Sequence, residues 1–144
     1  MTLPEFAKAL RILAIVIYTA SLLLAPYKTR DPVMEAIGIF ILSFGWVSLY
    51  GLMTAWLANP LVIFCFFQMK NKPALCSVLS VLALLAAHDF NKVHSLGFDS
   101  GRDIYAGEVI GIGLGCYVWL SSLAITFFAS LVFLLNSRRV HAQN

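Results

Sequence analysis

Uncharged apolar runs alternate with short charged segments along the whole chain. Four of these runs approach or exceed the roughly 20 residues that an α-helix needs to cross a membrane. They predict membrane spans at about 6–25, 49–69, 74–90 and 109–135, with an interfacial segment at about 33–44. We therefore predict a single transmembrane domain over residues 1–144, with the fold class all-α: an integral membrane four-helix bundle.

The second run, Ala36 to Met69, holds 34 consecutive residues without a formal charge. As one helix it would be about 51 Å long, whereas the hydrocarbon core is about 30 Å thick. Counting back about 21 residues from Met69 starts the span near Leu49. A single strongly tilted helix from Ala36 is the alternative. The count predicts a long second segment kinked near its centre at Asn59-Pro60, because proline removes a helix hydrogen bond.

The first run follows Lys8 and Arg11 in the layout of a signal peptide. A cleavage site after Ala25 is not expected, because Leu23 is too large two places earlier and Pro26 follows. We expect an uncleaved helix that ends at Pro26, with both cations reaching back to the nearer membrane surface.

The composition supports a membrane protein and excludes several other classes. Hydrophobic residues make up 60% of the chain and charged residues 12%, with a mean hydropathy of +0.86. A soluble domain of this size could not bury so much apolar surface. The net charge of +3 is spread over the ends of apolar runs, so no nucleic-acid partner is expected. Three cysteines without a C-x-x-C motif are expected to pack in the interior.

The charges predict the orientation of the spans. With four spans, the amino terminus, the turn at 70–73 and the carboxyl-terminal tail share one side. That side has six cations against Glu5, and the other has four cations against six acids. The net charges are then +5 and −2, which sum to the +3 of the chain. Positive charge marks the cytoplasmic side, so we expect both termini in the cytoplasm and the chain in the cell (inner) membrane. The six cations are Lys8, Arg11, Lys70, Lys72, Arg138 and Arg139.

The first candidate site is formed by Trp56, Asn59 and Pro60. Lipid cannot satisfy the donors and acceptor of an asparagine amide, so this side chain is expected to face other helices. The kinked helix either lines a pocket or pathway, or serves only structure, with the amide bonded to another span.

A second candidate is a helix-packing face made of Gly107, Gly111 and Gly115, at the start of the predicted fourth span. Glycines four residues apart on a helix leave a groove for another helix. This glycine ladder could pack within the bundle or between protomers of a homo-oligomer. Small residues continue along the span at Ser122, Thr126 and Ser130.

The longest polar segment, His88 to Glu108, offers possible metal ligands on the outer side: His88, Asp89 and His94, with Asp99, Asp103 and Glu108 further along. Their spacing matches no established ligand set, and neighbouring cations can pair with the carboxylates. We expect no metal, no haem and no other cofactor, and we assign no catalytic residue. The predicted spans also lack an interior carboxylate that would indicate a proton relay.

The sequence Trp56-Leu57-Ala58-Asn59-Pro60 resembles a set of small bacterial four-helix membrane proteins that carry W-x-A-N-P in a long second span. The resemblance covers about Gly45 to Ala87, including the short basic turn and the following apolar helix. It extends weakly to Tyr117-Val118-Trp119-Leu120. It implies the fold and carries no activity.

Three functions are compatible with these features. The first is a membrane protein without a catalytic site that acts through helix and outer-loop contacts, in an accessory, assembly or immunity-type role. Its partners would be the lipid bilayer and a protein partner or second copy. The second is a small oligomeric channel or transporter lined by Asn59 and the Ser/Thr face. The third is an outer-face membrane enzyme that uses His88, Asp89, His94 and Glu108.

Overall fold

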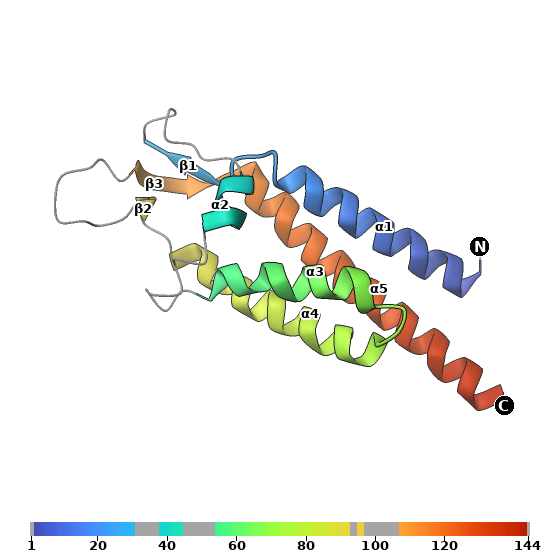
Figure 1. The fold of residues 1–144 in the computed structure, drawn as a ribbon. Helices are drawn as coiled ribbons and strands as arrows, with labels where there is room; N and C mark the ends of the chain where they lie inside the picture. Colours follow the sequence, from blue (N-terminus) through green and yellow to red (C-terminus); the bar gives the residue numbers. More distant parts are fainter. Residues whose placement is uncertain (1, 31–37, 45–53, 93–94, 97–106, 144) are drawn as a thin grey trace.

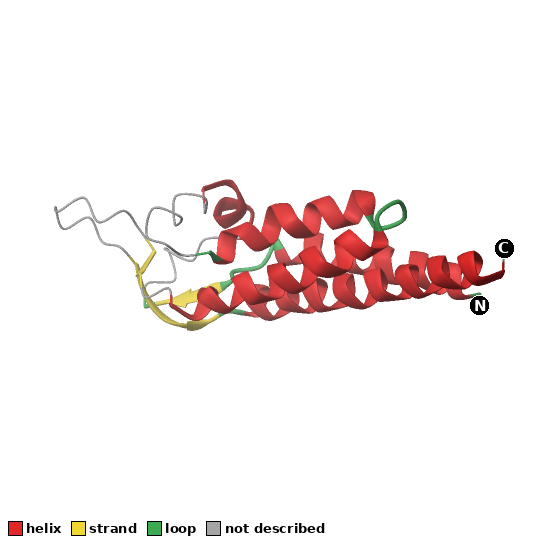
Figure 2. Ribbon diagram, turned by 90° about the horizontal axis from the view of Figure 1, so that it is seen from below, coloured by secondary structure: helices red, strands yellow, loops and turns green. Residues whose placement is uncertain are grey.

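The computed structural model describes residues 2–30, 38–44, 54–92, 95–96 and 107–143. Four helices form an elongated bundle (Figure 1): α1 (Leu3–Ser21), α3 (Ala58–Gln68), α4 (Pro73–Ala87) and α5 (Leu114–Gln143). Both termini lie at one end of the bundle, as does the turn between α3 and α4 (Figures 1 and 2). We call this end, with residues 2–8, 69–72 and 134–143, the terminal end.

The opposite end, which we call the sheet end, carries a small antiparallel sheet with the strand order β1-β3-β2 (Figure 2). β1 (Tyr27–Thr29) follows α1, and β3 (Gly107–Ile112) precedes α5, so the two strands pair where these helices meet. β2 (Ser95–Leu96) pairs with the start of β3. The short helix α2 (Gly38–Phe44) docks here through backbone hydrogen bonds from Gly38 and Ile39 to the carbonyls of Leu24 and Leu22.

Local sequence explains where the helices begin. The backbone N–H of Thr2 donates to the carboxylate of Glu5 at 2.7 Å, which is half of a capping box at the start of α1. Pro73 opens α4, in the helical turn where a missing N–H has no cost. A 3₁₀ turn, η3 (Ala55–Leu57), leads directly into α3, and another, η4 (His88–Lys92), extends α4.

The buried face of α4 consists of small residues. Alanine, serine and cysteine line the inside of α4, at Cys76, Ser77, Ser80, Ala83 and Ala87. Large apolar side chains on the same helix are exposed, among them Val78 (58%), Leu82 (46%) and Leu85 (65%). A water-soluble bundle has the opposite arrangement, because burial of large apolar side chains is what stabilises it. Small interior residues and large apolar exterior residues are typical of helices that pack inside lipid.

The other helices follow this division in part. α1 buries Ala7 and Ala14 and exposes Ile12 and Val16. Phe67 on α3 is 71% exposed, whereas α3 and α5 also bury large side chains, at Phe66, Trp119 and Leu123. Small buried residues allow close helix contacts, and α5 packs along both α1 and α4, with α3 against α4. Two clusters of buried side chains result, one towards the sheet end and one, around Met69, towards the terminal end.

Among the described residues, two helical segments are long and apolar enough to cross a membrane, Pro73–Phe90 and Leu114–Arg139. They correspond to the predicted spans at about 74–90 and 109–135. α1 corresponds to the predicted span at 6–25, but it ends at Ser21 and carries Glu5, Lys8 and Arg11. The helical segment Ala55–Gln68 is shorter, about 22 Å, and residues 45–53 of the predicted span lie outside the described residues.

Two predictions about secondary structure need correction. The chain is not purely helical, because residues 27–29, 95–96 and 107–112 form the sheet. The ladder of Gly107, Gly111 and Gly115 does not lie on one helix, since the first two glycines are in β3 and α5 begins at Leu114. Helical spacing alone could not reveal this, because the strand pairs with β1 from a distant part of the sequence. Of the predicted interfacial segment at about 33–44, the structure describes only α2.

Gly115 has a structural role that does not require a ladder. A Cβ atom at this position would lie 2.8 Å from the carbonyl oxygen of Leu24 and 2.9 Å from that of Ala25. Backbone atoms cannot move aside without shifting the chain. The turn after α1 and the first turn of α5 therefore touch backbone to backbone, and the N–H of Gly115 donates to the carbonyl of Ala25 at 3.0 Å.

We predict that Gly115→Ala destabilises the protein by about 1–3 kcal/mol, the range for steric overpacking. Gly111→Ala is the matched control, because nothing lies within 4 Å of a Cβ atom there. Thermal unfolding in detergent checks this pair. Equal melting temperatures for the two variants would contradict the close approach.

Candidate functional site

Asn59 lies in the first turn of α3, and its carboxamide oxygen joins three helices. The hydroxyl of Tyr18 on α1 and the indole Nε1 of Trp119 on α5 each donate a hydrogen bond to Oδ1 at 3.0 Å. The indole N–H can only donate, so the amide atom that faces it must be the oxygen. Asn59 is 8% exposed, so both bonds form in a buried setting. We call Tyr18, Asn59 and Trp119 the Asn59 junction.

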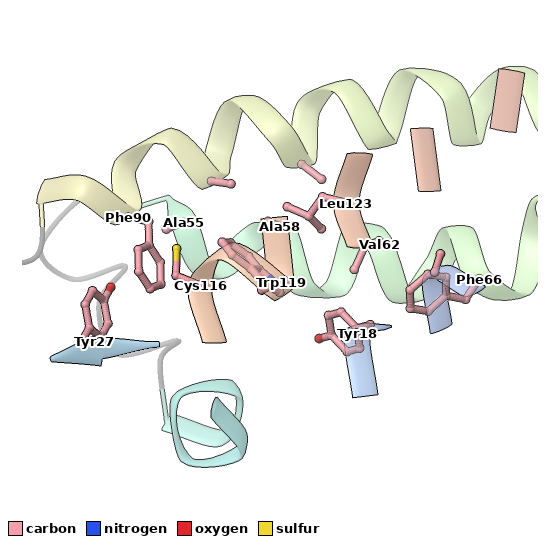
Figure 3. Close-up of a cluster of buried hydrophobic side chains, with 13 residues drawn as sticks. Tyr18, Tyr27, Ala55, Ala58, Val62, Phe66, Phe90, Cys116, Trp119 and Leu123 are labelled. Atoms are coloured by element: carbon pink, nitrogen blue, oxygen red, sulfur yellow. The ribbon is translucent and has the colours of Figure 1, made fainter. Parts of the chain in front are cut away.

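A series of aromatic rings runs from the sheet to this junction (Figure 3). Tyr27 on β1 stacks on Phe90 with ring centroids 4.2 Å apart, and Phe90 packs against Trp119 at 5.6 Å. On the far side of the junction, Tyr18 meets Phe66 edge to face at 5.5 Å. Burial, with a smaller contribution from nearby Cys116, raises the pKa of the Tyr27 phenol, so its hydroxyl stays protonated. The rings connect the sheet to the interior of the bundle.

The neighbours of Asn59 in the motif also make structural contacts. The indole Nε1 of Trp56 donates to the carbonyl of Leu42 on α2 at 2.8 Å, which attaches α2 to the start of α3. Pro60 is exposed and lies in the first turn of α3. Because η3 leads into α3 without a break, the N–H that Pro60 lacks is missing from the turn that joins the two, opposite the carbonyl of Trp56. Residues 45–53 lie outside the described residues, so the predicted kink of a longer span at Asn59-Pro60 stays a prediction; in the described segment Ala55–Gln68 the change from 3₁₀ to α-helix falls just before this pair.

A contact that the sequence did not reveal holds this helix start in place. The backbone N–H and the hydroxyl of Thr54 both donate to Oδ2 of Asp89, at 3.2 and 2.6 Å. The carboxylate thus receives hydrogen bonds at the beginning of η3, where helix N–H groups lack intrahelical partners. Asp89 binds Thr54 across 35 positions of sequence, so local pattern gave no signal for the pair.

The remaining candidates for an outer-face site do not converge among the described residues. His88 is exposed in η4, and Asp89 is engaged with Thr54. Glu108 lies in β3 opposite Ser95, while His94, Asp99 and Asp103 lie outside the described residues. Within the described residues no group of three or more His, Cys, Asp or Glu could hold a metal ion.

The Ser/Thr face of α5 is buried within one chain. Ser122, Thr126 and Ser130 are all 0% exposed. Their hydroxyls donate to the carbonyls of Trp119, Ser122 and Thr126 in the same helix, at 2.6, 2.7 and 2.8 Å. These side chains therefore act as small packing residues whose donors are already satisfied. They do not line an open channel in the single chain.

The three cysteines are also buried packing residues. Cys65 and Cys76 face each other across the α3–α4 hairpin, with the thiol of Cys65 3.5 Å from the carbonyl oxygen of Cys76. Cys116 packs beside Tyr27 and Trp119 in the other cluster. All three are free thiols.

The chemistry of an asparagine amide predicts that Asn59 faces other helices, whereas its partners, Tyr18 and Trp119, are seen only in the structure. Tyr18 carries a hydroxyl inside an otherwise apolar part of α1, and a buried tyrosine hydroxyl usually finds an acceptor. That signal, read together with Trp119, could have pointed to a shared acceptor. Comparison with known proteins gives no further guidance: no family model matches the chain, and neither curated proteins nor solved structures show a match.

We predict that Asn59→Leu lowers the stability more than Tyr18→Phe does. Leucine removes the acceptor and leaves two donors unsatisfied, at about 1–3 kcal/mol each, whereas Tyr18→Phe removes one donor and keeps the Trp119 bond. Ser121→Ala is the control, because Ser121 is exposed and donates only to the carbonyl of Tyr117 in its own helix. Unfolding of the variants in detergent measures these differences.

A double-mutant cycle between Tyr18→Phe and Asn59→Leu isolates the pair. Additive effects on the free energy of unfolding would show that the hydroxyl and the amide do not interact. A coupling of about 0.6–2 kcal/mol is expected for a hydrogen bond between helices in a membrane protein.

Proposed function

We propose that the chain is a four-span integral membrane protein of the inner membrane that acts through contacts of its helices and of the sheet end, in an accessory, assembly or immunity-type role. The observation that carries the membrane part is the large number of exposed large apolar side chains on the helices, opposite small buried residues on α4 and on much of α1. Lipid is the solvent in which this arrangement is favourable. The two long apolar helices α4 and α5 add weaker support.

The charges at the two ends support the proposed orientation. The terminal end carries Lys8, Arg11, Lys70, Lys72, Arg138 and Arg139, with Glu5 as the acid among its described residues. Lys and Arg near the ends of spans favour the cytoplasmic side. Both termini and the α3–α4 turn would then face the cytoplasm, and the sheet would face outward.

The hydrogen bonds of the polar side chains favour the contact role over a channel and over an outer-face enzyme. The Ser/Thr face of α5 and Asn59, which a channel would need, are buried and hydrogen-bonded within one chain. Asp89, which an outer-face enzyme would need, is bound to Thr54. These polar groups thus hold the bundle together. Among the described residues, the small sheet is the structured part that lies beyond the helices, and we take it as the contact surface.

We predict that reporter fusions after Asn71 and after Asn144 are active in the cytoplasm, and that a reporter inserted after Ser100 is active outside it. Paired reporters with opposite compartment requirements provide the internal control. Cytoplasmic activity for the insertion at Ser100 would refute the four-span orientation.

We predict that mild-detergent purification from native membranes recovers the chain in a stoichiometric assembly with a different protein, detectable by mass spectrometry of the intact complex. Substitutions in the sheet, such as Ile110→Glu at an exposed position of β3, should release the partner without unfolding the bundle. Lys28 is exposed on β1, so Lys28→Glu tests whether a change of charge alone releases the partner. A homo-oligomer with a continuous water path would overturn the contact role.

A further inference from the structure

Arg11 occupies an inward position on α1. α1 buries Ala7, Ala14, Tyr18 and Ser21. Residue 11 completes this series, since positions 7, 11, 14, 18 and 21 are separated by alternating steps of four and three residues. That alternation marks the side of a helix that packs against a partner, and α1 packs chiefly along α5. The guanidinium is therefore attached to the packed side of α1.

The side chain is half-buried, and its Nε atom is buried with no hydrogen-bond partner. Within the described residues, Nε of Arg11 is the one buried side-chain nitrogen or oxygen that has no hydrogen-bond partner. A buried N–H on a permanently charged group is costly to leave unpaired, so this atom requires an explanation. Arg11 as a whole is only half-buried, so part of the residue remains accessible from outside.

The level of Arg11 in the bundle can be judged from its neighbours. Ala7, one turn towards the amino terminus, packs in the same cluster as Met69, which directly precedes the exposed Lys70. Arg11 therefore starts about 6 Å further inside than the α3–α4 turn. Side chains on a helix lean towards its amino terminus, which here is the terminal end. A side chain of this length then delivers its guanidinium to about the level of Lys70.

The charges around this level are almost all positive. Lys8, Lys70, Lys72, Arg138 and Arg139 are exposed at the terminal end. The carboxylate of Glu5 already accepts the N–H of Thr2, and that hydrogen bond holds the pKa of Glu5 below its ordinary value. The described part of the chain thus supplies no free acid for Arg11. The described residues therefore leave the complement of Arg11 to a group outside them, and its level in the bundle points to an anion at the depth of the membrane surface.

We propose that the guanidinium of Arg11 binds the phosphate of an anionic phospholipid, with Lys8 and Lys70 contributing positive charge nearby. Arginine matches phosphate geometry and keeps its charge when partly buried. Basic sites between helices on the cytoplasmic side are known to bind anionic headgroups. The inference rests on the membrane placement proposed above, and it adds a specific ligand class and a specific residue.

The test uses full-length protein in mild detergent, stripped of lipid and then titrated with phosphatidylglycerol or phosphatidylcholine. Mass spectrometry of the intact protein counts bound lipid, and thermal unfolding records the shift of the melting temperature. We expect phosphatidylglycerol to bind and to raise the melting temperature, and Arg11→Gln to weaken binding about tenfold and abolish the shift. Phosphatidylcholine should bind weakly to both proteins.

Two further variants separate a site from general charge. Arg138→Gln removes the same charge at an exposed position of the same end and should bind phosphatidylglycerol as the wild type does. Arg11→Lys keeps the charge without the guanidinium and should bind with intermediate strength. Without lipid, Arg11→Gln should be at least as stable as the wild type, because it removes a buried unpaired charged group, and this verifies that the variant folds.

Several results would overturn the proposal. Equal lipid binding by wild type and Arg11→Gln, or an equal loss in Arg138→Gln, would show that Arg11 forms no site. If millimolar inorganic phosphate displaces the lipid, the site binds a free anion. If Arg11 holds an acidic protein partner in place of lipid, the site is a protein contact. If reporters place the termini outside while Arg11-dependent lipid binding persists, the orientation fails and the lipid site stands.

Discussion

The two hydrogen bonds received by the carboxamide oxygen of Asn59 fix how α1, α3 and α5 lie relative to one another. Both donors come from other helices and lie far from Asn59 in sequence, 41 and 60 positions away. In a low-dielectric interior an unpaired amide or indole N–H is costly, so alternative packings that separate these groups are disfavoured. Apolar contacts between small residues are less directional and could be satisfied in several helix arrangements. The polar junction therefore selects one arrangement from many that are equally apolar.

The contacts around the junction extend this constraint to the sheet end. Trp119 also packs against Phe90, which stacks on Tyr27 of β1, so the sheet is held in line with the interior of the bundle. Thr54 and Asp89 join the start of η3 to the end of α4, and Trp56 attaches α2. The backbone contact at Gly115 brings the end of α1 against the start of α5. Polar contacts concentrate here, whereas the exposed surface of the helices remains apolar.

The sequence predicted the helical class well because apolar run length is a one-dimensional signal. Lys70 and Lys72 marked the end of α3 correctly, and the run before His88 became α4. The strands could not be predicted, because β1 has three residues and depends on pairing with β3 from the far end of the chain. For the same reason helical spacing misassigns the glycines at 107 and 111, which lie in β3. The chemistry of Asn59 predicts that it faces other helices, but its partners depend on tertiary packing that spacing does not encode.

In the proposed membrane arrangement, the large apolar side chains on the outside of the bundle face lipid. Spin labels on α4 of the full-length protein in lipid vesicles test it directly, by comparing collision with oxygen, which dissolves in lipid, and with a water-soluble nickel complex. Labels at Val78, Leu82 and Leu85, which are exposed, should collide with oxygen and be protected from nickel. Labels at Ser80 and Ala83, which are buried, should be protected from both. Ready collision of the nickel complex with the labels at Val78, Leu82 and Leu85 would contradict the account.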